Sequence, residues 1–245
     1  MPVAYATGVF NKLMDWQAFL EIDRAVLEFF NGSNSLFLDH LMSLLTSGFT
    51  WIPLYLALFY LIVKNNETMA QIGLAVGCTL LCLALTEGMA DGLIKPLVAR
   101  LRPVDDPSVA GSVDTVYGVF ATGYSFFSAH AANTMGIAVF FALLVRNRVF
   151  TWFMVLWALL NGYTRLYLGV HYPSDVLAGF LWGMVAATLS YFIYQKVYKR
   201  ITPALNYISS QYTSTGYSLK DVDVVLSVLV YTIAIVILGS PFIFH

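Results

Sequence analysis

The sequence has little charge for its length. Aspartate, glutamate, lysine and arginine make up 11% of its 245 residues, whereas a soluble domain carries roughly 25%. The net charge is −1, so the chain has no basic field that would attract nucleic acid. Hydrophobic residues, in contrast, make up 59% of the sequence. These proportions exclude an ordinary soluble domain and predict an integral membrane protein.

Cysteine is also scarce. Cys78 and Cys82 lie one helical turn apart in an apolar run, and two cysteines so placed cannot pair within a straight helix, so a structural disulfide is excluded. The first residues have no basic segment and no clean apolar stretch, and we therefore do not expect a cleaved signal peptide. No internal repeat and no low-complexity tract is present. Residues 1–245 are expected to form a single membrane domain.

Long apolar runs account for most of the chain. A transmembrane helix needs about 20 apolar residues. By this criterion the fold class is all-α, a polytopic membrane bundle of about six transmembrane helices. The predicted spans lie near residues 41–63, 69–94, 131–145, 149–163, 174–194 and 222–238.

The segment before the first span has a different pattern. Residues 16–30 are apolar on one side but include four charged side chains. This pattern predicts an amphipathic helix that lies at the membrane interface, within an N-terminal segment 1–40.

The basic residues predict which way the bundle faces. Six spans place the loops 95–130 and 164–173 on one side of the membrane, and the loops 64–68, 146–148 and 196–221 on the other. Once the cations assigned below to a site are set aside, the second group of loops holds the excess of lysine and arginine. Such an excess faces the cytoplasm, so the first group is expected to face outward.

The first polar motif is "KPLVARLRP". Lys95 and Arg102 are seven residues apart, which is about two helical turns and places them on one helix face. Pro96 either kinks the span or begins a new short helix, and Pro103 is expected to end that helix. The alternative is that both cations simply flank the membrane and extend to the lipid headgroups.

The second motif, "SFFSAHAAN", contains Ser128 and His130 at the beginning of a predicted span. The N-terminus of a helix offers free backbone N–H groups, here at Ala129 and His130, and a partial positive charge that suits an anion. Alternatively, His130 is a capping or interfacial residue.

The third motif, "RLYLGVHYPSDV", contains Arg165, His171 and Asp175. Pro173 stands where the first turn of a helix would begin, so Asp175 can fold back toward His171. A carboxylate at one ring nitrogen fixes the tautomer and leaves the other nitrogen as a nucleophile. The alternative is an acid at a helix N-terminus beside an interfacial histidine.

Together the motifs describe a site for a phosphoryl group. Three cations and the backbone N–H groups would neutralise the phosphate oxygens as charge spreads in the transition state. His171, oriented by Asp175, would attack phosphorus and form a phosphohistidine. His130 would protonate the leaving oxygen and then deprotonate the hydrolytic water. We expect no metal and no other cofactor, because cations already accompany the carboxylates and histidines.

The three motifs, in this order and spacing, resemble the signatures of the type 2 phosphatidic acid phosphatase (PAP2) superfamily, in its bacterial membrane lipid phosphatase branch. The resemblance spans roughly residues 85–190 and implies a helical catalytic core, a phosphohistidine intermediate, no metal and a site facing the periplasm. It implies that phosphate is bound by Lys95, Arg102, Arg165, Ser128 and the backbone at Ala129, and that catalysis uses His130, His171 and Asp175.

Two motifs depart from the family pattern. In the second motif, Phe127 replaces the usual proline, which loosens the approach to the helix but removes no chemistry. Ala129 replaces the usual glycine; a positive φ there would cost of order 1 kcal/mol, so we expect ordinary backbone angles. Thr164 replaces the usual serine before Arg165 and keeps a hydroxyl. None of these changes removes a catalytic group.

Two acids precede the first motif. Glu87 and Asp91 form a row with Lys95 at four-residue intervals. Asp91 is expected to pair with Lys95 and orient it, and Glu87 lies deeper, where a charge is costly unless it is neutralised or paired. We expect both to support the site; the alternative is a polar lining for a lipid headgroup. The long segment 104–126 is expected to cover the site.

The predicted function is an integral membrane lipid phosphate phosphatase of the bacterial inner membrane, with its site facing the periplasm or outside. Candidate substrates are lipid A, undecaprenyl diphosphate, phosphatidylglycerophosphate and phosphatidate; the form of the second motif favours lipid A or an isoprenyl diphosphate. One alternative is a vanadate-dependent haloperoxidase, against which the membrane-spanning character argues. Another is a transporter that uses the charges of Glu87, Asp91 and Lys95, which would require polar residues on several helices at midplane depth.

Overall fold

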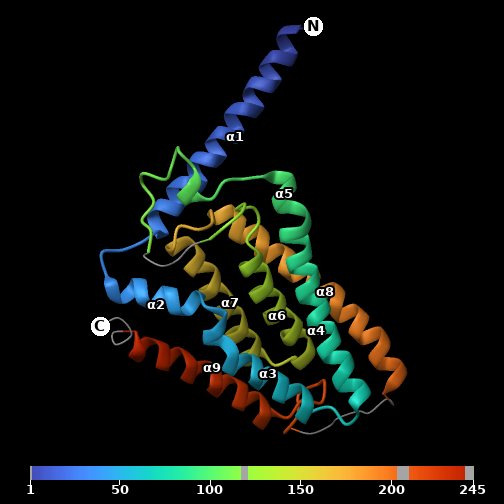
Figure 1. Ribbon diagram of the computed structural model, residues 1–245. Helices are drawn as coiled ribbons and strands as arrows, with labels where there is room; N and C mark the ends of the chain where they lie inside the picture. The colour runs from blue at the N-terminus through green and yellow to red at the C-terminus, as the bar shows by residue number, and fades with distance from the viewer. Residues whose placement is uncertain (1, 117–120, 203–209, 241–245) are drawn as a thin grey trace.

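The computed structural model describes residues 2–116, 121–202 and 210–240, with side chains from residue 16 onward. Within these ranges every regular element is a helix (Figure 1), which confirms the predicted all-α class. The centre of the bundle consists of α4 (Met69–Met89), α6 (Ala129–Val145), α7 (Arg148–Tyr167) and α8 (Pro173–Ile201). Helix α6 packs against the other three, so the second motif begins the helix at the middle of the fold.

Two glycines bring α8 into backbone contact with α6. A Cβ atom at Gly179 would lie 2.5 Å from the carbonyl oxygen of Ser128, and one at Gly183 would lie 2.4 Å from that of Ala132. No larger residue fits at either position without moving a helix. The contact continues at the ends of the helices, where the Ser128 N–H donates to the Asp175 carbonyl oxygen at 3.0 Å. The beginnings of α6 and α8, which carry the second and third motifs, are thereby held together.

The second predicted span ends in an irregular turn. Helix α4 continues through a π-helical turn, η2 (Ala90–Ile94), into the short helix α5 (Lys95–Val98), with Pro96 in its first turn. The interruption follows from Pro96, which has no N–H to donate to the preceding turn. Pro96 therefore stands in the first turn of a short helix, as one alternative predicted, but this helix continues the segment Met69–Asp105.

The same region corrects two expectations for the first motif. Helix α5 ends at Val98, because Ala99 adopts a positive φ of 48°. Lys95 and Arg102 therefore do not share a helix face. Pro103 does not end that helix either; it begins a separate 3-10 turn, η3 (Pro103–Asp105).

The first predicted span is broken in two. Helix α2 (Leu36–Thr46) meets the segment Gly48–Lys64, made of the 3-10 turn η1 (Gly48–Trp51) and α3 (Ile52–Lys64), at an angle of 65°. Ser47 between them is extended. The bend is stabilised by side chains that satisfy carbonyls at the end of α2: Thr50 Oγ1 donates to Leu44 at 2.6 Å, and Trp51 Nε1 to Leu45 at 2.8 Å.

Helix α1 (Pro2–Phe30) is longer than the amphipathic helix predicted over residues 16–30, and it projects from one end of the bundle (Figure 1). Its position relative to a membrane interface stays a prediction. One of its charged residues, Asp23, is only 5% exposed and is not on a solvated face. This side of α1 packs against α7 and α8.

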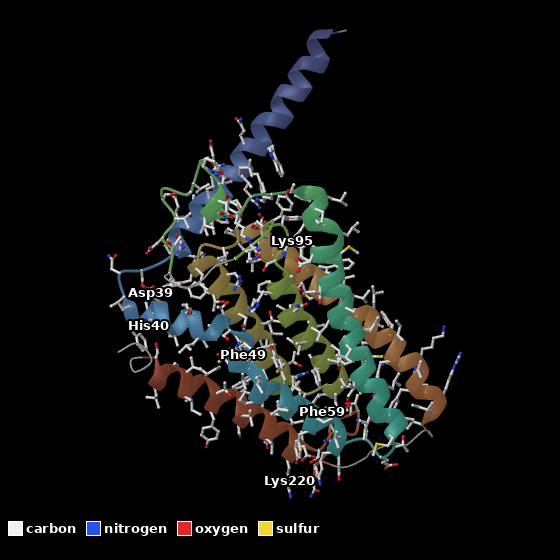
Figure 2. The ribbon with its side chains drawn as sticks, in the orientation of Figure 1. Asp39, His40, Phe49, Phe59, Lys95 and Lys220 are labelled. Atoms are coloured by element: carbon white, nitrogen blue, oxygen red, sulfur yellow. The ribbon has the colours of Figure 1, made fainter. Side chains whose placement is uncertain are left out.

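By length and composition, the described residues contain fewer candidate membrane spans than the six predicted. Among the described residues, the segments Met69–Asp105, Pro173–Ile201 and Leu219–Gly239 are long and apolar enough to cross a membrane, and a fourth span results if the bent pair counts as one. The last of these segments is α9, which packs against α3 and α2. Six crossings therefore stay a prediction. Lys95 lies at the end from which α1 projects and Lys220 at the opposite end (Figure 2), as the predicted division of the loops requires.

Candidate active site

The three motifs meet at the end of the bundle from which α1 projects. Hydrogen bonds and charge interactions connect residues of all three motifs, although Arg102 and Asp175 are 73 positions apart in the chain. The segment after α5, the first turn of α6, the last turns of α7 and the α7–α8 connection each contribute. The residues concerned are Arg102, Ser128, His130, Arg165, His171 and Asp175.

His171 lies in the connection between α7 and α8 and is 2% exposed. Its Nε2 atom is 3.3 Å from Nη1 of Arg102. Because a guanidinium can only donate, Nε2 accepts, and the ring proton of neutral His171 is on Nδ1. The nitrogen whose electron pair accepts this bond therefore faces a fixed cation, and that cation would attract an anionic substrate.

The predicted contact between His171 and Asp175 is indirect. The Nδ1 to Oδ2 distance is 3.7 Å, and Ser125 lies between them, with Oγ 3.4 Å from Nδ1 and its hydroxyl donating to Oδ2. Asp175 is fully buried and is held by other donors: the N–H of Tyr172 reaches Oδ2 at 2.9 Å, and Nη1 of Arg100 reaches Oδ1 at 2.7 Å. Because Oδ2 already accepts hydrogen bonds from Ser125 and Tyr172, Asp175 orients His171 through the hydroxyl of Ser125.

Arg102 is more firmly held than its predicted role requires. It is 4% exposed, and it donates to the carbonyl oxygens of Gly123, Val170 and Thr122 at 3.0, 3.0 and 2.9 Å. These bonds join the segment before α6 to the connection that carries His171. The guanidinium is therefore a rigid cation next to Nε2, with part of its donor capacity left over.

Arg165 has unused hydrogen-bonding capacity. Its Nη1 donates to Thr46 Oγ1 of α2 at 2.6 Å, while its Nε is buried without a partner among the described residues. Its charge acts on both histidines and on Arg102. Two guanidinium groups that repel each other beside a buried free donor form a strong site for an anion with several oxygens.

The first turn of α6 supplies further groups. His130 Nε2 is 3.3 Å from Asn161 Oδ1, and the Asn161 amide donates in turn to the Trp157 carbonyl at 2.9 Å. Since this fixes the amide, Nε2 of His130 donates, and Nδ1 carries no proton when the ring is neutral. Ser128 Oγ accepts the Ala131 N–H at 3.3 Å, so its own proton remains available to an anion.

The departures from the family pattern at Ala129 and Thr164 are accommodated. Ala129 is helical, as expected, and is not among the residues with positive φ. Thr164 is buried and donates to the Asn161 carbonyl at 2.7 Å. This bond stabilises the turn of α7 that carries Asn161, the residue that contacts His130.

The acidic row beside the first motif is paired along its length. Lys95 forms an ion pair with Asp91, and Glu87 accepts from Asn133 Nδ2 of α6 at 2.6 Å. Asp91 also interacts with Glu87 and with the charge of Arg102. The row thus joins α4 to the helix that carries His130.

Sequence reasoning missed three residues of this site. Ser125, Asn161 and Thr46 each contact a motif residue from a different element. Ser125 is the first residue of the second motif but was given no role there, and Asn161 and Thr46 stand at no motif spacing from their partners, so only the folded arrangement reveals these contacts.

Burial, opposed by the nearby Asp175 carboxylate and assisted by the arginine charges, lowers the pKa of His171 to about 4. In the unfolded chain a histidine titrates near pH 6.5, so between these values the unfolded state binds more protons. The free energy of unfolding should therefore fall as the pH decreases from about 6.5 toward 4, and be fully restored above 6.5. Thermal unfolding in detergent at pH 7 and pH 4.5 measures this.

We expect the decrease in Tm between pH 7 and pH 4.5 to be smaller in His171→Asn than in the wild type. His40→Asn, which changes a histidine outside the three motifs, is the control. An equal decrease in Tm in His171→Asn and the wild type would contradict the lowered pKa of His171.

Comparison with known proteins finds a matching family, two similar phosphatases and a solved structure with a similar fold. The family model of the PAP2 superfamily matches residues 75–199. The lipid A 4′-phosphatase of Bacteroides thetaiotaomicron is 36% identical over 225 residues, which cover 90% of this chain and 96% of that protein. The lipid A 4′-phosphatase of Porphyromonas gingivalis is 29% identical over 177 residues, 71% of this chain and 74% of that protein. The PAP2-type phosphatidylglycerolphosphate phosphatase of Bacillus subtilis has a similar fold, with a TM-score of 0.57 and 22% identity over 77% of this chain and 90% of the other. The matched range 75–199 contains the three motifs, whereas α1 and α2 lie outside it.

Proposed function

The chain belongs to the PAP2 superfamily and is a membrane lipid phosphatase, and we propose that it removes the 4′-phosphate of lipid A. The observation that carries the phosphatase chemistry is the setting of His171, with Nε2 facing Arg102 and Nδ1 facing Ser125. The choice of lipid A rests on the two relatives named lipid A 4′-phosphatase, one of them aligned over 96% of its length.

The phosphate is bound by cations and by hydrogen-bond donors in this proposal. Arg165 offers its buried Nε, Ser128 its hydroxyl proton, and Ala129 a backbone N–H that has no partner within the first turn of its helix. Arg102 and Lys95 complete the positive surroundings. Donors held in place before the reaction stabilise the charge that develops on the phosphoryl oxygens without reorganisation.

The reaction proceeds in two displacements. Nε2 of His171 attacks phosphorus, the P–N bond forms, and the bond from phosphorus to the lipid oxygen breaks. His130, protonated on Nδ1 as well as on Nε2, gives its Nδ1 proton to that oxygen while Nε2–H remains bonded to Asn161. It then takes a proton from water, whose oxygen attacks phosphorus; the P–N bond breaks, and inorganic phosphate leaves with His171 restored. The cations take the charge-neutralising part that a metal takes in other phosphatases.

Three further residues support these groups. Asp91 orients Lys95 through their ion pair, and Glu87 anchors the row to α6 through Asn133. Thr164 braces the Asn161 turn behind His130.

We place the protein in the bacterial inner membrane as a multi-pass protein, with the site facing the periplasm. This orientation is supported by the excess of basic residues in the loops at the Lys220 end, which is opposite to the Lys95 end (Figure 2). The phosphorylated headgroup would then reach the site from the outer leaflet.

Phosphate release by the purified protein in detergent tests the substrate. We expect release from lipid A that carries both its 1- and 4′-phosphates, with product analysis showing the 4′-phosphate removed and the 1-phosphate retained. Lipid A that carries only the 1-phosphate is the matched control and should release little. The same assay includes undecaprenyl diphosphate and phosphatidylglycerophosphate.

Preferential hydrolysis of either of these lipids would contradict lipid A as the substrate while leaving the phosphatase chemistry intact. No release from any of them, in a folded preparation, would contradict the function itself.

A further inference from the structure

Helix α1 places a buried carboxylate beside the active site. The Asp23 side chain is 4% exposed and accepts three hydrogen bonds: from Arg100 Nη2 at 2.7 Å, and from the N–H and the hydroxyl of Ser174 at 2.8 and 2.6 Å. Ser174 belongs to the first turn of α8, where an anion is stabilised by free N–H groups. Asp23 therefore caps, from another helix, the helix that carries Asp175.

Arg100 joins Asp23 to both groups that orient His171. Its Nη1 donates to Asp175 Oδ1 at 2.7 Å, while its carbonyl oxygen accepts the N–H of Ser125 at 2.8 Å. The guanidinium lies 3.8 Å above the ring of Tyr172, which limits its movement. One arginine thus holds the carboxylate and the serine that lie behind the histidine.

We propose that Asp23 and Arg100 are positioning residues for the phosphatase reaction, and that they act on His171 through Asp175 and Ser125. This inference rests on the proposed role of His171 as the nucleophile. It assigns a part in catalysis to α1, which lies outside the matched range 75–199.

The charges explain why Asp23 is needed as well as Arg100. When His171 attacks phosphorus, its ring acquires positive charge, which a net negative charge behind it stabilises. Arg100 alone would neutralise Asp175. Because Asp23 shares the guanidinium through Nη2, the group of two carboxylates and one arginine remains negative toward the ring.

The alternative is that Asp23 only fastens α1 to the bundle. Other contacts of α1 do this without reaching Asp175: Glu28 Oε1 accepts from Ser112 Oγ at 3.0 Å, and Arg24 Nη2 donates to Ser108 Oγ at 2.8 Å. Loss of one of these contacts loosens α1 but leaves Arg100 and Asp175 unchanged. Glu28→Ala is therefore the matched control.

The test compares Asp23→Asn, Arg100→Gln, the double variant and Glu28→Ala in the full chain, with whichever lipid phosphate the wild type hydrolyses. We expect Asp23→Asn to lower kcat about 10-fold with little change in KM, as is typical for residues that orient a reacting group. The rate of phosphohistidine formation in a single turnover should fall equally. Arg100→Gln should lower kcat at least as much, the double variant no further than Arg100→Gln alone, and Glu28→Ala should retain the wild-type kcat.

Additive effects on kcat in the double variant would overturn the proposal, as would an Asp23→Asn protein with a lower Tm but unchanged kcat. If Asp23→Asn does not fold, Arg100→Lys tests the same idea, since lysine keeps the charge but cannot bridge two carboxylates; an unchanged kcat in that variant would also overturn it. A folded wild type that releases no phosphate overturns the proposed function and this inference with it, whereas wild-type activity with an unaffected Asp23→Asn overturns this inference alone.

Discussion

His171→Ala is expected to abolish phosphate release, by a factor of at least about 1,000, in a protein that still folds. Alanine removes the nitrogen that we propose bonds to phosphorus, and neither neighbouring group can replace it, because Arg102 is a cation and Ser125 faces Asp175. The buried site loses a polar side chain but keeps the internal contacts of Asp175 with Arg100 and Tyr172. The measurement is phosphate release at saturating lipid, with thermal unfolding as the test of folding.

Ser125→Ala is the graded comparison for this variant. It leaves Nε2 in place and removes only the group that connects Nδ1 to Asp175, so its loss of activity should be smaller than that of His171→Ala. Acid-labile labelled phosphate bound to the protein, trapped in a single turnover, should be present in the wild type and missing in His171→Ala. Turnover close to that of the wild type in a folded His171→Ala protein would refute the nucleophilic role.

The second large effect is expected for Arg165→Gln, with kcat/KM reduced roughly 100- to 1,000-fold. Arg165 has a buried Nε without a partner among the described residues and a charge that acts on both histidines and on Arg102. Arg165 should therefore stabilise the transition state most strongly, because the oxygens of the transferring phosphoryl group then have the most charge. Glutamine keeps a hydrogen-bond donor but no charge.

Inhibition by orthovanadate separates binding of the transition state from folding. Vanadate adopts the five-coordinate geometry of a phosphoryl transfer, so Arg165→Gln should weaken it by a factor similar to the loss in kcat/KM. Thr46→Val, which removes the contact with Nη1 and keeps the cation, should have a much smaller effect. Equal losses in the two variants would mean that Arg165 serves packing rather than phosphate.

The parts of the site that could be predicted from the sequence are those whose partners are near in the chain or share a motif. His171 and Asp175 are four residues apart, and Pro173 marks the start of the helix that carries Asp175, so their proximity followed from local geometry. Ser125 between them did not, because it comes from an irregular segment that is positioned by the Arg100 carbonyl.

The prediction failed where backbone conformation changed without a strong local signal. Lys95 and Arg102 were placed on one helix face, and the left-handed Ala99 separates them; alanine rarely adopts that conformation. The bend at Ser47 was likewise missed, since Thr50 and Trp51 stabilise it through side-chain bonds that an apolar pattern does not show.

The contact between α6 and α8 has a consequence for the path of the substrate. At Gly179 and Gly183 the two backbones touch with no space for even a methyl group. An acyl chain cannot pass between these helices, and they cannot separate without loss of the Ser128–Asp175 hydrogen bond. In the proposed function, a lipid must therefore approach the phosphate site from another side of the bundle, because the α6–α8 pair closes this one.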